Sequence, residues 1–360
     1  MRLFYTLMCV ILIAATRDQA AGQTERNPVI ITPLASGVSA SFRGLAVRNS
    51  HEAWITGSHG TVIRTTNFGS TWQHVKVPDA EELDFRDVEI LRDGSVLLMS
   101  IGNGGASRLL RSTDSGNTWK TVLVNAEPEG FFDGMAFLPN GRKGVLFGDP
   151  IDGRLDMYQT GDGGATWQRF PPQQRPEMKK GEYGFAASGT GIVLSHGNIW
   201  IATGGSVARV LHSADDGITW DAYDTPIRSG NESSGIFSID FIDHKRAVVI
   251  GGNYSQPELD RDNVATSVDG GRTWLTLPTV RMPHKACLQS LGGGRLLTCG
   301  RTGVAFSADN GRTWKTISTD SYYTLAVDRS SGSGFLAGKN GHIARFELAP
   351  AAGASPDKNE

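Results

Sequence analysis

An eight-residue pattern, Ser/Thr-x-Asp-x-Gly-x-Thr-Trp, recurs six times along this 360-residue chain and limits its possible folds more than any other feature. Its copies, which we call boxes, occupy 65–72, 112–119, 160–167, 213–220, 267–274 and 307–314. Their tryptophans are 40 to 54 residues apart. This is the period of a unit of about four short strands, such as a propeller blade.

The residue types of the box suit a turn between two strands. Its carboxylate can accept hydrogen bonds from nearby backbone N–H groups, and its Gly accepts a positive φ. The Thr-Trp pair then opens the outgoing strand, where the large ring can pack on a neighbouring turn or blade. Because every unit carries the same residues, we assign them a structural role. These residues are Asn67, Asp114, Asp162, Asp215, Asp269 and Asp309, and the tryptophans Trp72, Trp119, Trp167, Trp220, Trp274 and Trp314.

The N-terminus has the pattern of a secretory signal peptide. Met1-Arg2 precedes an apolar run over 3–15, and small residues follow around Ala20-Ala21-Gly22. The run is shorter than the roughly 20 residues of a membrane span. We expect residues 1–22 to be removed and the protein to be exported to a periplasmic or extracellular compartment, without a membrane span. An uncleaved anchor and a buried N-terminal helix are the alternatives.

Composition and periodicity indicate a single all-β domain over 23–348. Short alternating or apolar runs bounded by Gly, Asn and Asp dominate, and amphipathic helical windows are scarce. The 35 basic and 37 acidic residues nearly balance, so no basic field indicates a nucleic acid partner. The tail, 349–360, is rich in Ala, Pro, Ser and Gly, and we expect it to be disordered.

Seven segments read as the first strand of a blade, one more than the number of boxes. They are 41–47, 84–90, 131–137, 183–187, 235–241, 286–290 and 322–327. The last unit has three strands and no box, and the segment Val29–Leu34 has no partner in the first unit. We therefore expect a seven-bladed propeller whose ring is closed by Val29–Leu34 pairing beside 342–346, which would remove an exposed edge. Pro33 fits an outermost strand.

The boxes closely resemble the Asp-box of sialidases and related propellers. The segments 42–47, 53–57 and 60–66 in turn look like a unit of the photosystem II stability and assembly factor family, and the similarity covers nearly all of 29–347. This resemblance implies an exported, monomeric and non-enzymatic scaffold that binds a partner protein and needs no cofactor. Of that family's basic patch, only Arg43 and Arg86 can be matched. The partner of the photosynthetic members is therefore not carried over.

A sialidase-like glycoside hydrolase or a glycan-binding propeller is the alternative. Such enzymes need three arginines that converge on a carboxylate, together with a Tyr nucleophile paired with a Glu. The candidate arginines are Arg43, Arg86, Arg209 and Arg301, with Glu182 beside Tyr183, or Tyr323, as their partners. Seven first strands agree poorly with the six blades of that family.

The first strands also predict where a binding site would lie, because their leading ends open at the mouth of the central channel. Aligning these strands brings side chains of different blades to one height. The candidates are Arg43, Arg86, Asp133, Phe237 and Tyr323, with Glu182 and Tyr183 near the same height. The alternative is that these side chains only line and solvate the channel.

The remaining chemistry is sparse. Eight histidines are scattered singly, without the paired spacing of a zinc site. The acidic segments 149–156 and 258–262 read as solvated loops, so we expect no bound metal, and a calcium ion held by these carboxylates is the alternative. Cys287 and Cys299 flank the glycine turn 292–294 symmetrically. We expect them to face each other across a hairpin and to form a disulfide or at least a bondable pair.

Overall fold

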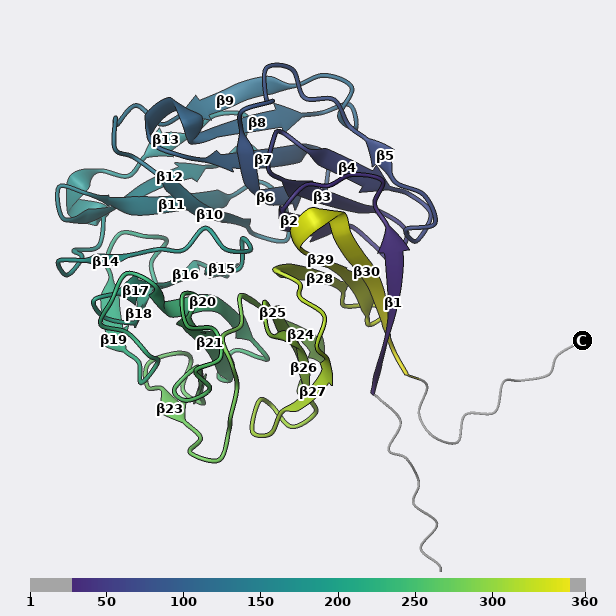
Figure 1. Ribbon diagram of the computed structural model, residues 1–360. Helices are drawn as coiled ribbons and strands as arrows, with labels where there is room; N and C mark the ends of the chain where they lie inside the picture. Colours follow the sequence, from purple (N-terminus) through teal and green to yellow (C-terminus); the bar gives the residue numbers. More distant parts are fainter. Residues whose placement is uncertain (1–27, 350–360) are drawn as a thin grey trace, which may run out of the picture.

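Seven blades surround a central channel in the computed structural model, which describes residues 28–349 (Figure 1). Six of the seven sheets have four strands and one has six. The helical elements within 28–349 are three short 3-10 turns, Gly104–Ala106, Pro172–Gln174 and Lys339–Gly341. The expected all-β, seven-bladed fold is confirmed. The expected signal peptide, 1–22, lies outside the described residues, and so does the expected tail apart from Ala349.

The strands follow one another from the channel outwards in each blade. Blade one contains β2 (Phe42–Val47), β3 (Ala53–Gly57), β4 (Val62–Thr65) and β5 (Gln73–His74). Blade two contains β6 (Asp84–Ile90), β7 (Val96–Ile101), β8 (Arg108–Ser112) and β9 (Lys120–Val124). Blade three contains β10 (Phe132–Phe137), β11 (Gly144–Ile151), β12 (Arg154–Thr160) and β13 (Gln168–Arg169). Blade four contains β15 (Ile192–Ser195), β16 (Asn198–Ala202), β18 (Arg209–Ser213) and β19 (Asp221–Asp224).

Blade five is the six-stranded sheet. Its four regular strands are β20 (Ser234–Phe241), β21 (Ala247–Asn253), β22 (Val264–Ser267) and β23 (Leu275–Thr276). Two short strands, β14 (Glu182–Tyr183) and β17 (Gly204–Gly205), extend it on the channel side. Blade six contains β24 (Cys287–Gly292), β25 (Arg295–Gly300), β26 (Gly303–Ser307) and β27 (Lys315–Ser318). Blade seven contains β28 (Thr324–Asp328), β29 (Ser333–Ala337), β30 (His342–Leu348) and β1 (Val29–Ala35).

The two ends of the described chain meet in blade seven, where β1 pairs antiparallel with β30 (Figure 1). The register runs from Val29 opposite Leu348 to Ala35 opposite His342. The N-terminal strand thus supplies the outer strand that the last unit lacks, and it covers an edge that would otherwise be open to pairing. The expected closure of the ring is confirmed, and Pro33 lies on the outermost strand.

Each box is a turn held together by its own side chains. In the second box, Ser112 and the backbone N–H of Thr118 both donate to Oδ1 of Asp114, at 2.8 Å each, and the Thr118 hydroxyl donates to Oδ2 at 2.6 Å. The Trp119 indole closes the turn by donating to the carbonyl of Gly116 at 3.1 Å. In the first box, Oδ1 and Nδ2 of Asn67 bond the same groups. The box residues are therefore structural.

The tryptophan of each box packs into the interface between its own blade and the preceding one. Trp119 of blade two meets Trp54 of blade one edge to face, with ring centroids 6.4 Å apart. Trp72 of blade one meets Phe335 of blade seven in the same way at 5.5 Å. Burial of these large rings therefore joins the blades into a ring.

Polar side chains of the inner strands satisfy backbone N–H groups of the next blade. Asp87 of blade two accepts the N–H of Met135 at 2.9 Å. Asp240 of blade five accepts that of Ser290 at 2.7 Å. An inner strand is the free edge of its sheet, so its N–H groups need such partners. These carboxylates inside the channel are structural.

The first strand of blade four differs from the sequence expectation. The segment 183–187 was expected there, but the inner strand of blade four is β15. Tyr183 belongs instead to β14, which pairs with β17 of the blade-five sheet. The expectation was wrong because 183–187 alternates aromatic and small residues, which is the pattern of a strand. The small residues at 184, 186 and 187 also allow the chain to cross the channel instead of forming a blade strand.

This crossing segment lies inside the channel. Residues 184–191, which we call the plug, touch the inner ends of several blades. Arg86 of blade two donates to the carbonyl of Ala186 at 3.1 Å, and the N–H of Ile239 in blade five donates to the carbonyl of Thr190 at 3.0 Å. Ser188 donates to the carbonyl of Ala286, next to blade six, at 2.9 Å. The plug therefore crosses the channel, and its residues 184–187 line a cavity at the mouth, which we call the cup.

Candidate functional site

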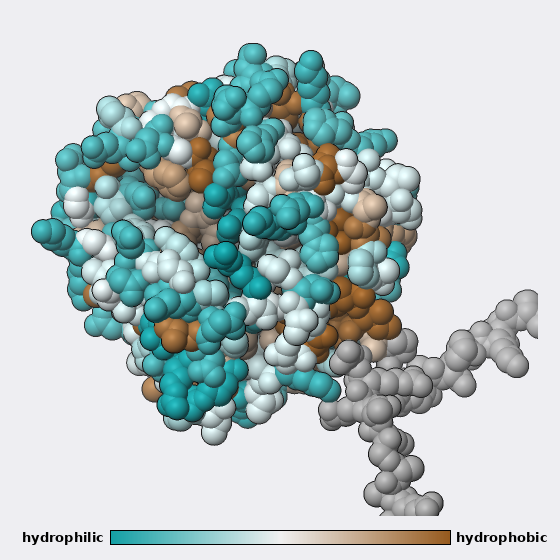
Figure 2. All heavy atoms as spheres, in the orientation of Figure 1, coloured by the Kyte–Doolittle hydropathy of each residue, from teal (hydrophilic) through white to brown (hydrophobic). Residues whose placement is uncertain are grey.

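The cup is a cavity of about 620 Å³ at the mouth of the channel, with the plug as its floor. It brings together six of the seven residues that the sequence singled out, namely Arg43, Arg86, Asp133, Tyr183, Phe237 and Tyr323. These residues come from blades one, two, three, five and seven and from β14. The face seen in Figure 2 carries mainly hydrophilic and pale side chains, with the hydrophobic ones in separate patches.

One half of the cup is cationic. The guanidinium of Arg43 lies 4.0 Å above the ring of Tyr323. Burial and the nearby charge of Arg86 lower the pKa of Arg43 to about 10. The Nε atom of Arg43 is buried without a hydrogen-bond partner. This guanidinium is held by packing and has donor capacity left for a ligand.

Two further arginines complete this half. Arg86 donates to one carboxylate oxygen of Asp84 from both Nε and Nη2, at 2.9 and 2.8 Å, so its side chain is fixed. Arg301 reaches in from blade six and donates to the carbonyl of Tyr254 at 3.3 Å. With Arg43, these side chains offer planar N–H donors of the kind that bind carboxylates.

An aromatic wall lies on the side of blades four and five. Phe185 of the plug and Phe237 of β20 are stacked, with centroids 4.0 Å apart and an interplanar angle of 12°. Tyr254 stands edge-on to both rings, at 6.5 and 6.2 Å. His284 meets Phe237 edge-on at 4.6 Å, and Tyr183 meets Phe185 at 5.6 Å. The wall offers aromatic faces and edges to an apolar or cationic group.

Two carboxyl groups also line the cup, Asp133 on β10 and Asp149 on β11 of blade three, which is the blade next to that of Arg86. Burial, and then the charge of Asp149, raise the pKa of Asp133 well above its usual range. Burial also raises the pKa of Asp149, to about 6. Both groups line the cup, which therefore holds acidic groups on blade three as well as the three arginines.

Glu182 does not reach the cup, and this corrects the sequence expectation. Its carboxylate is buried and receives the guanidinium of Arg209 at 2.6 and 2.8 Å and the hydroxyl of Thr203 at 2.7 Å. Successive residues of a strand point to opposite faces. Since Tyr183 faces the cup, Glu182 must face away. Glu182 and Arg209 are therefore structural, and Arg209 does not converge with the other arginines.

Several lining residues were not among the channel-mouth candidates. Arg301 was a candidate only for the glycosidase alternative, and Asp149 was read as part of a solvated loop. Each follows a Gly, Gly300 or Gly148, but the residues after the corresponding Gly57 and Gly338 do not line the cup, so this Gly alone is not a sufficient signal. Phe185, Tyr254 and His284 lie on the plug and on loops, where no repeat position marks them.

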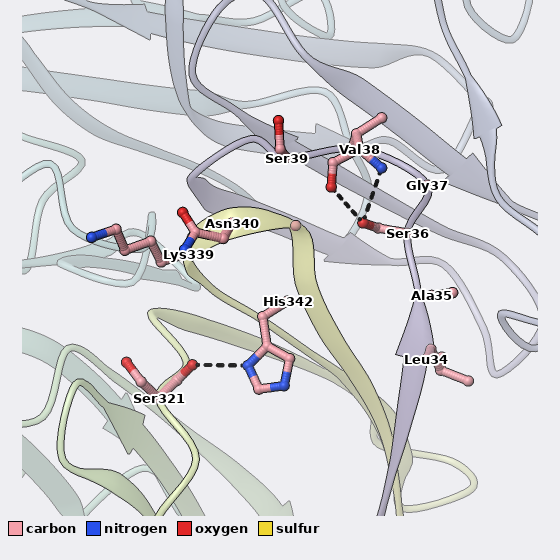
Figure 3. A pocket seen from close by; sticks show the side chains of 11 residues that line it. Leu34, Ala35, Ser36, Gly37, Val38, Ser39, Ser321, Lys339, Asn340 and His342 are labelled. Atoms are coloured by element: carbon pink, nitrogen blue, oxygen red, sulfur yellow. Dashed lines mark hydrogen bonds between the residues drawn. The ribbon is translucent and has the colours of Figure 1, made fainter.

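A second hollow, of about 850 Å³, lies beside β1 and the turn 339–341 (Figure 3). Ser36 bonds the backbone of Val38 there at 3.1 and 3.4 Å, and the ring of His342 lies 3.4 Å from the carbonyl of Ser321. In Figure 3 only Ser36 and His342 are drawn with hydrogen bonds, both to backbone groups. The hollow is larger than the cup but lacks its converging charges, so we do not assign it as the site.

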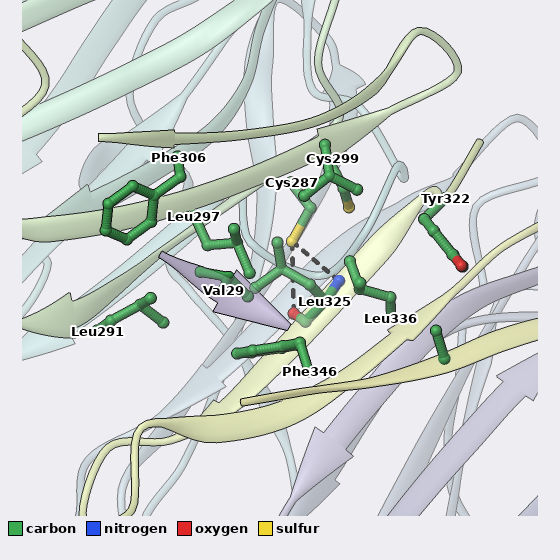
Figure 4. Close-up of a cluster of buried hydrophobic side chains, with 12 residues drawn as sticks. Val29, Cys287, Leu291, Leu297, Cys299, Phe306, Tyr322, Leu325, Leu336 and Phe346 are labelled. Atoms are coloured by element: carbon green, nitrogen blue, oxygen red, sulfur yellow. Dashed lines mark hydrogen bonds between the residues drawn. The ribbon is translucent and has the colours of Figure 1, made fainter. Parts of the chain in front are cut away.

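Cys287 and Cys299 are direct partners across the β24–β25 hairpin, as expected from the sequence. Both are buried in the hydrophobic cluster between blades six and seven (Figure 4). The structure carries them as free thiols. Sγ of Cys287 accepts the N–H of Leu325 at 3.4 Å. The pairing register is thus confirmed, and the disulfide itself stays a prediction.

The expected solvated acidic segment 149–156 divides between two environments. Asp149 faces the cup, whereas Asp156 is buried and accepts a hydrogen bond from Arg169 at 2.7 Å. Within 28–349, no three His, Cys, Asp or Glu side chains come together in a way that could hold a metal ion. No helix in the same range is long and apolar enough to cross a membrane.

Fold and site together define a seven-bladed propeller with a channel crossed by the plug and a charged, aromatic cup. No protein-family model matches the chain. Over 157 residues, 43% of this chain, it is 24% identical to the photosystem II stability/assembly factor HCF136, chloroplastic, of Oryza sativa subsp. japonica. That match spans about a third (35%) of the rice protein.

Solved structures are similar over most of their length. YCF48 bound to D1 peptide has a TM-score of 0.64 at 17% identity, covering 90% of this chain and 98% of that chain. YCF48 from Cyanidioschyzon merolae has a TM-score of 0.60 at 18% identity, covering 89% and 99%. The WD40 propeller domain of Doa1 has a TM-score of 0.58 at 12% identity, covering 91% and 100%. These likenesses establish the propeller fold.

Proposed function

We propose that the cup binds a segment of a partner protein and that the chain acts as a non-enzymatic scaffold. The observation that carries this proposal is the convergence of three arginines and an aromatic wall on one cavity of about 620 Å³. An acidic side chain or a terminal carboxylate of the partner would bind at Arg43, Arg86 and Arg301. A neighbouring apolar side chain would pack on Phe185 and Phe237.

The similar proteins support the same class of function. One of them is YCF48 bound to a D1 peptide, and another is a stability/assembly factor. We propose for this chain a protein partner in the compartment to which it is exported. The signal-like pattern of residues 1–22 and the resemblance of the boxes to the Asp-box support that location.

A glycosidase function is the second candidate, because Arg43, Arg86 and Arg301 converge as a sialidase would need. The tyrosines argue against it. The hydroxyl of Tyr183 donates to the backbone carbonyl of Glu232 at 2.5 Å, and the ring of Tyr323 lies beneath Arg43. Neither tyrosine has the carboxylate partner that would make it a nucleophile.

Selection of random displayed peptides on the immobilised protein tests the proposal. We expect a shared acidic and apolar pattern among the selected peptides. Arg43→Ala and Arg301→Ala should each weaken their binding about tenfold or more, since a charge-assisted bond is lost. Arg92→Ala is the matched control, because Arg92 is an exposed arginine in the turn at the other end of β6.

A fluorogenic sialoside assay on the same samples separates the two candidates. Absence of turnover together with selected peptides that need Arg43 supports the scaffold. Turnover that Arg43→Ala abolishes would replace it with a glycosidase. Peptide binding that survives both arginine substitutions would move the site away from the cup.

A further inference from the structure

We propose that Asp133 and Asp149, which line the cup on blade three, take a positively charged group of the same ligand. This inference rests on the proposed function and specifies the ligand further. The partner segment would be bipolar, with an acidic group toward Arg43, Arg86 and Arg301 and a lysine, an arginine or a free amino group toward the two aspartates.

Local geometry brings the two aspartates together. The β10–β11 register is regular at Phe132 opposite Gly148 and shifts directly afterwards, so Asp133 is the extra residue of a β-bulge. A bulge turns a side chain out of the regular alternation, and here it places Asp133 beside Asp149, the residue that follows Gly148. The two carboxyl groups interact, since the charge of Asp149 adds to burial in raising the pKa of Asp133.

Neither carboxyl group is neutralised by a cation of the protein. Gly184 of the plug lies against Asp133, since a Cβ at Gly184 would be 2.5 Å from Oδ2 of Asp133. Oδ2 of Asp133 and Oδ1 of Asp149 are buried without a hydrogen-bond partner. Two buried carboxylates close together are costly to charge at the same time, which favours one proton on the pair.

One cation and several acidic or phenolic groups surround the pair. Arg86 on β6 is the nearest cationic lining residue by blade order, and its guanidinium is committed to Asp84 and to the carbonyl of Ala186. Arg43 and Arg301 belong to blades one and six. The remaining titratable groups near the pair are acidic or phenolic, namely Tyr183, Glu232 and, against the plug at Gly189, Asp87. A cationic ligand group would therefore meet unopposed negative charge.

Two other features of this cup point to a ligand. The ring of His284 lines the cavity and is only 2% exposed, yet neither ring nitrogen has a hydrogen-bond partner. Burial, and then the charges of Lys285, Arg301 and Arg43, lower the pKa of His284 to about 3, so the ring is neutral and offers a ligand one donor and one acceptor nitrogen near the arginines. The stacked rings of Phe185 and Phe237 add aromatic surface that stabilises a cation.

The proton balance is simple. Before binding, the pair carries one proton and one negative charge. A cation placed against it favours the doubly ionised form, so the shared proton leaves to solvent and no covalent bond changes. Affinity for a bipolar peptide should therefore rise with pH through the titration of the pair, and binding should release a proton.

The test uses the tightest peptide from the display selection and a version in which norleucine replaces its basic residue. Calorimetry in buffers of different ionisation enthalpy should detect proton release with the first peptide and none with the second. Asp149→Asn should remove the proton release and weaken the basic peptide about tenfold, while leaving the norleucine version unchanged. Asp152→Asn is the matched control, since Asp152 is exposed at the tip of the same β11–β12 hairpin.

Thermal unfolding checks that Asp149→Asn is folded, and Asp149→Glu, which retains the charge, should keep the preference for the basic peptide if the variant is folded. Selected peptides that are acidic and apolar but carry no basic group would overturn the inference and leave the scaffold proposal intact. Equal proton release by both peptides would also overturn it. Loss of all peptide binding in Arg43→Ala and Arg301→Ala bears on the scaffold proposal alone.

Discussion

The guanidinium of Arg43 in the first blade lies 4.0 Å above the ring of Tyr323 in the last blade, so the two ends of the ring meet inside the cup. We expect Tyr323→Leu to release Arg43 and to weaken acidic peptides. A double-mutant cycle of Arg43→Ala and Tyr323→Leu should give a coupling of about 0.5 to 1 kcal/mol in stability. Additive effects on both stability and binding would show that the contact does not position Arg43.

The boxes should contribute to stability and not to binding. Asp269→Ala removes the bonds that its carboxylate accepts from Ser267 and Thr273, at 2.7 to 2.9 Å. We expect the free energy of unfolding to fall by about 1 to 2 kcal/mol in urea titrations. Peptide affinity should stay unchanged, because the box is not among the lining residues of the cup. Lost binding at unchanged stability would make the boxes the site.

Acid should destabilise the ring through the same turns. Hydrogen bonds, first from the following Thr hydroxyl, lower the pKa of Asp114, Asp162 and Asp215 to about 2 in the folded protein. Their unfolded pKa is near 3.9, so this stabilisation is fully present above about pH 4 and is lost as the pH falls toward 2. Melting temperatures should decline over that window.

The natural Asn67 supplies the control for the acid titration. Its amide makes the turn bonds without a titrating group, so Asn should be accepted in the other boxes. The variant with Asp114→Asn, Asp162→Asn and Asp215→Asn should lose less melting temperature between pH 4 and 2 than the wild type. An identical decline in both proteins would assign the acid sensitivity to other carboxyl groups.

Features that repeat along the chain were predictable from the sequence. The boxes set the period, and the missing outer strand of the last unit required a partner, which β1 provides. Arg43 and Tyr323 were predicted correctly because the inner strands of all blades begin at the same height in the channel. A residue near the start of an inner strand therefore lies at the mouth of the channel. The same reasoning gave the hairpin register of Cys287 and Cys299.

Features that depend on a single departure from the repeat were not predictable. The plug replaces the expected first strand of blade four, and nothing in a run of small and aromatic residues distinguishes a chain crossing the channel from a strand. The position of Glu182 was predicted wrongly. Successive residues of a strand point to opposite faces, and because Tyr183 faces the cup, the side chain of Glu182 points away from it and bonds Arg209. Arg301 was a candidate only for the glycosidase alternative, and Asp149 was read as part of an acidic loop. Both lie on second strands or just after them, so their place in the cup depends on the three-dimensional closure of the ring.

The plug should tolerate no added side chain at its closest approach to blade two. Gly189 has φ +73°, and a Cβ there would lie 2.3 Å from Oδ1 of Asp87. Gly153 has the same φ with nothing near its Cβ position. Gly189→Ala should therefore lower the free energy of unfolding by about 1 to 3 kcal/mol more than Gly153→Ala, and it should weaken peptide binding because the plug is the floor of the cup. Equal losses of unfolding free energy for the two variants in urea titrations would mean that the plug backbone shifts at Gly189 without cost.

Cys287 and Cys299 should form a disulfide when the protein matures in an oxidising compartment. Directly opposed residues of antiparallel strands have Cα atoms about 4.5 to 5.5 Å apart, within disulfide reach. Both thiols are fully buried, so the bond should form during folding and then resist mild reductants. Thiol counting on the denatured, unreduced protein should find no reactive thiol and, after reduction, two. Reduction should lower the free energy of unfolding by about 2 to 3 kcal/mol. The Cys287→Ser variant should show one reactive thiol and no effect of reductant, and two reactive thiols in the unreduced wild type would reject the bond while leaving the register in place.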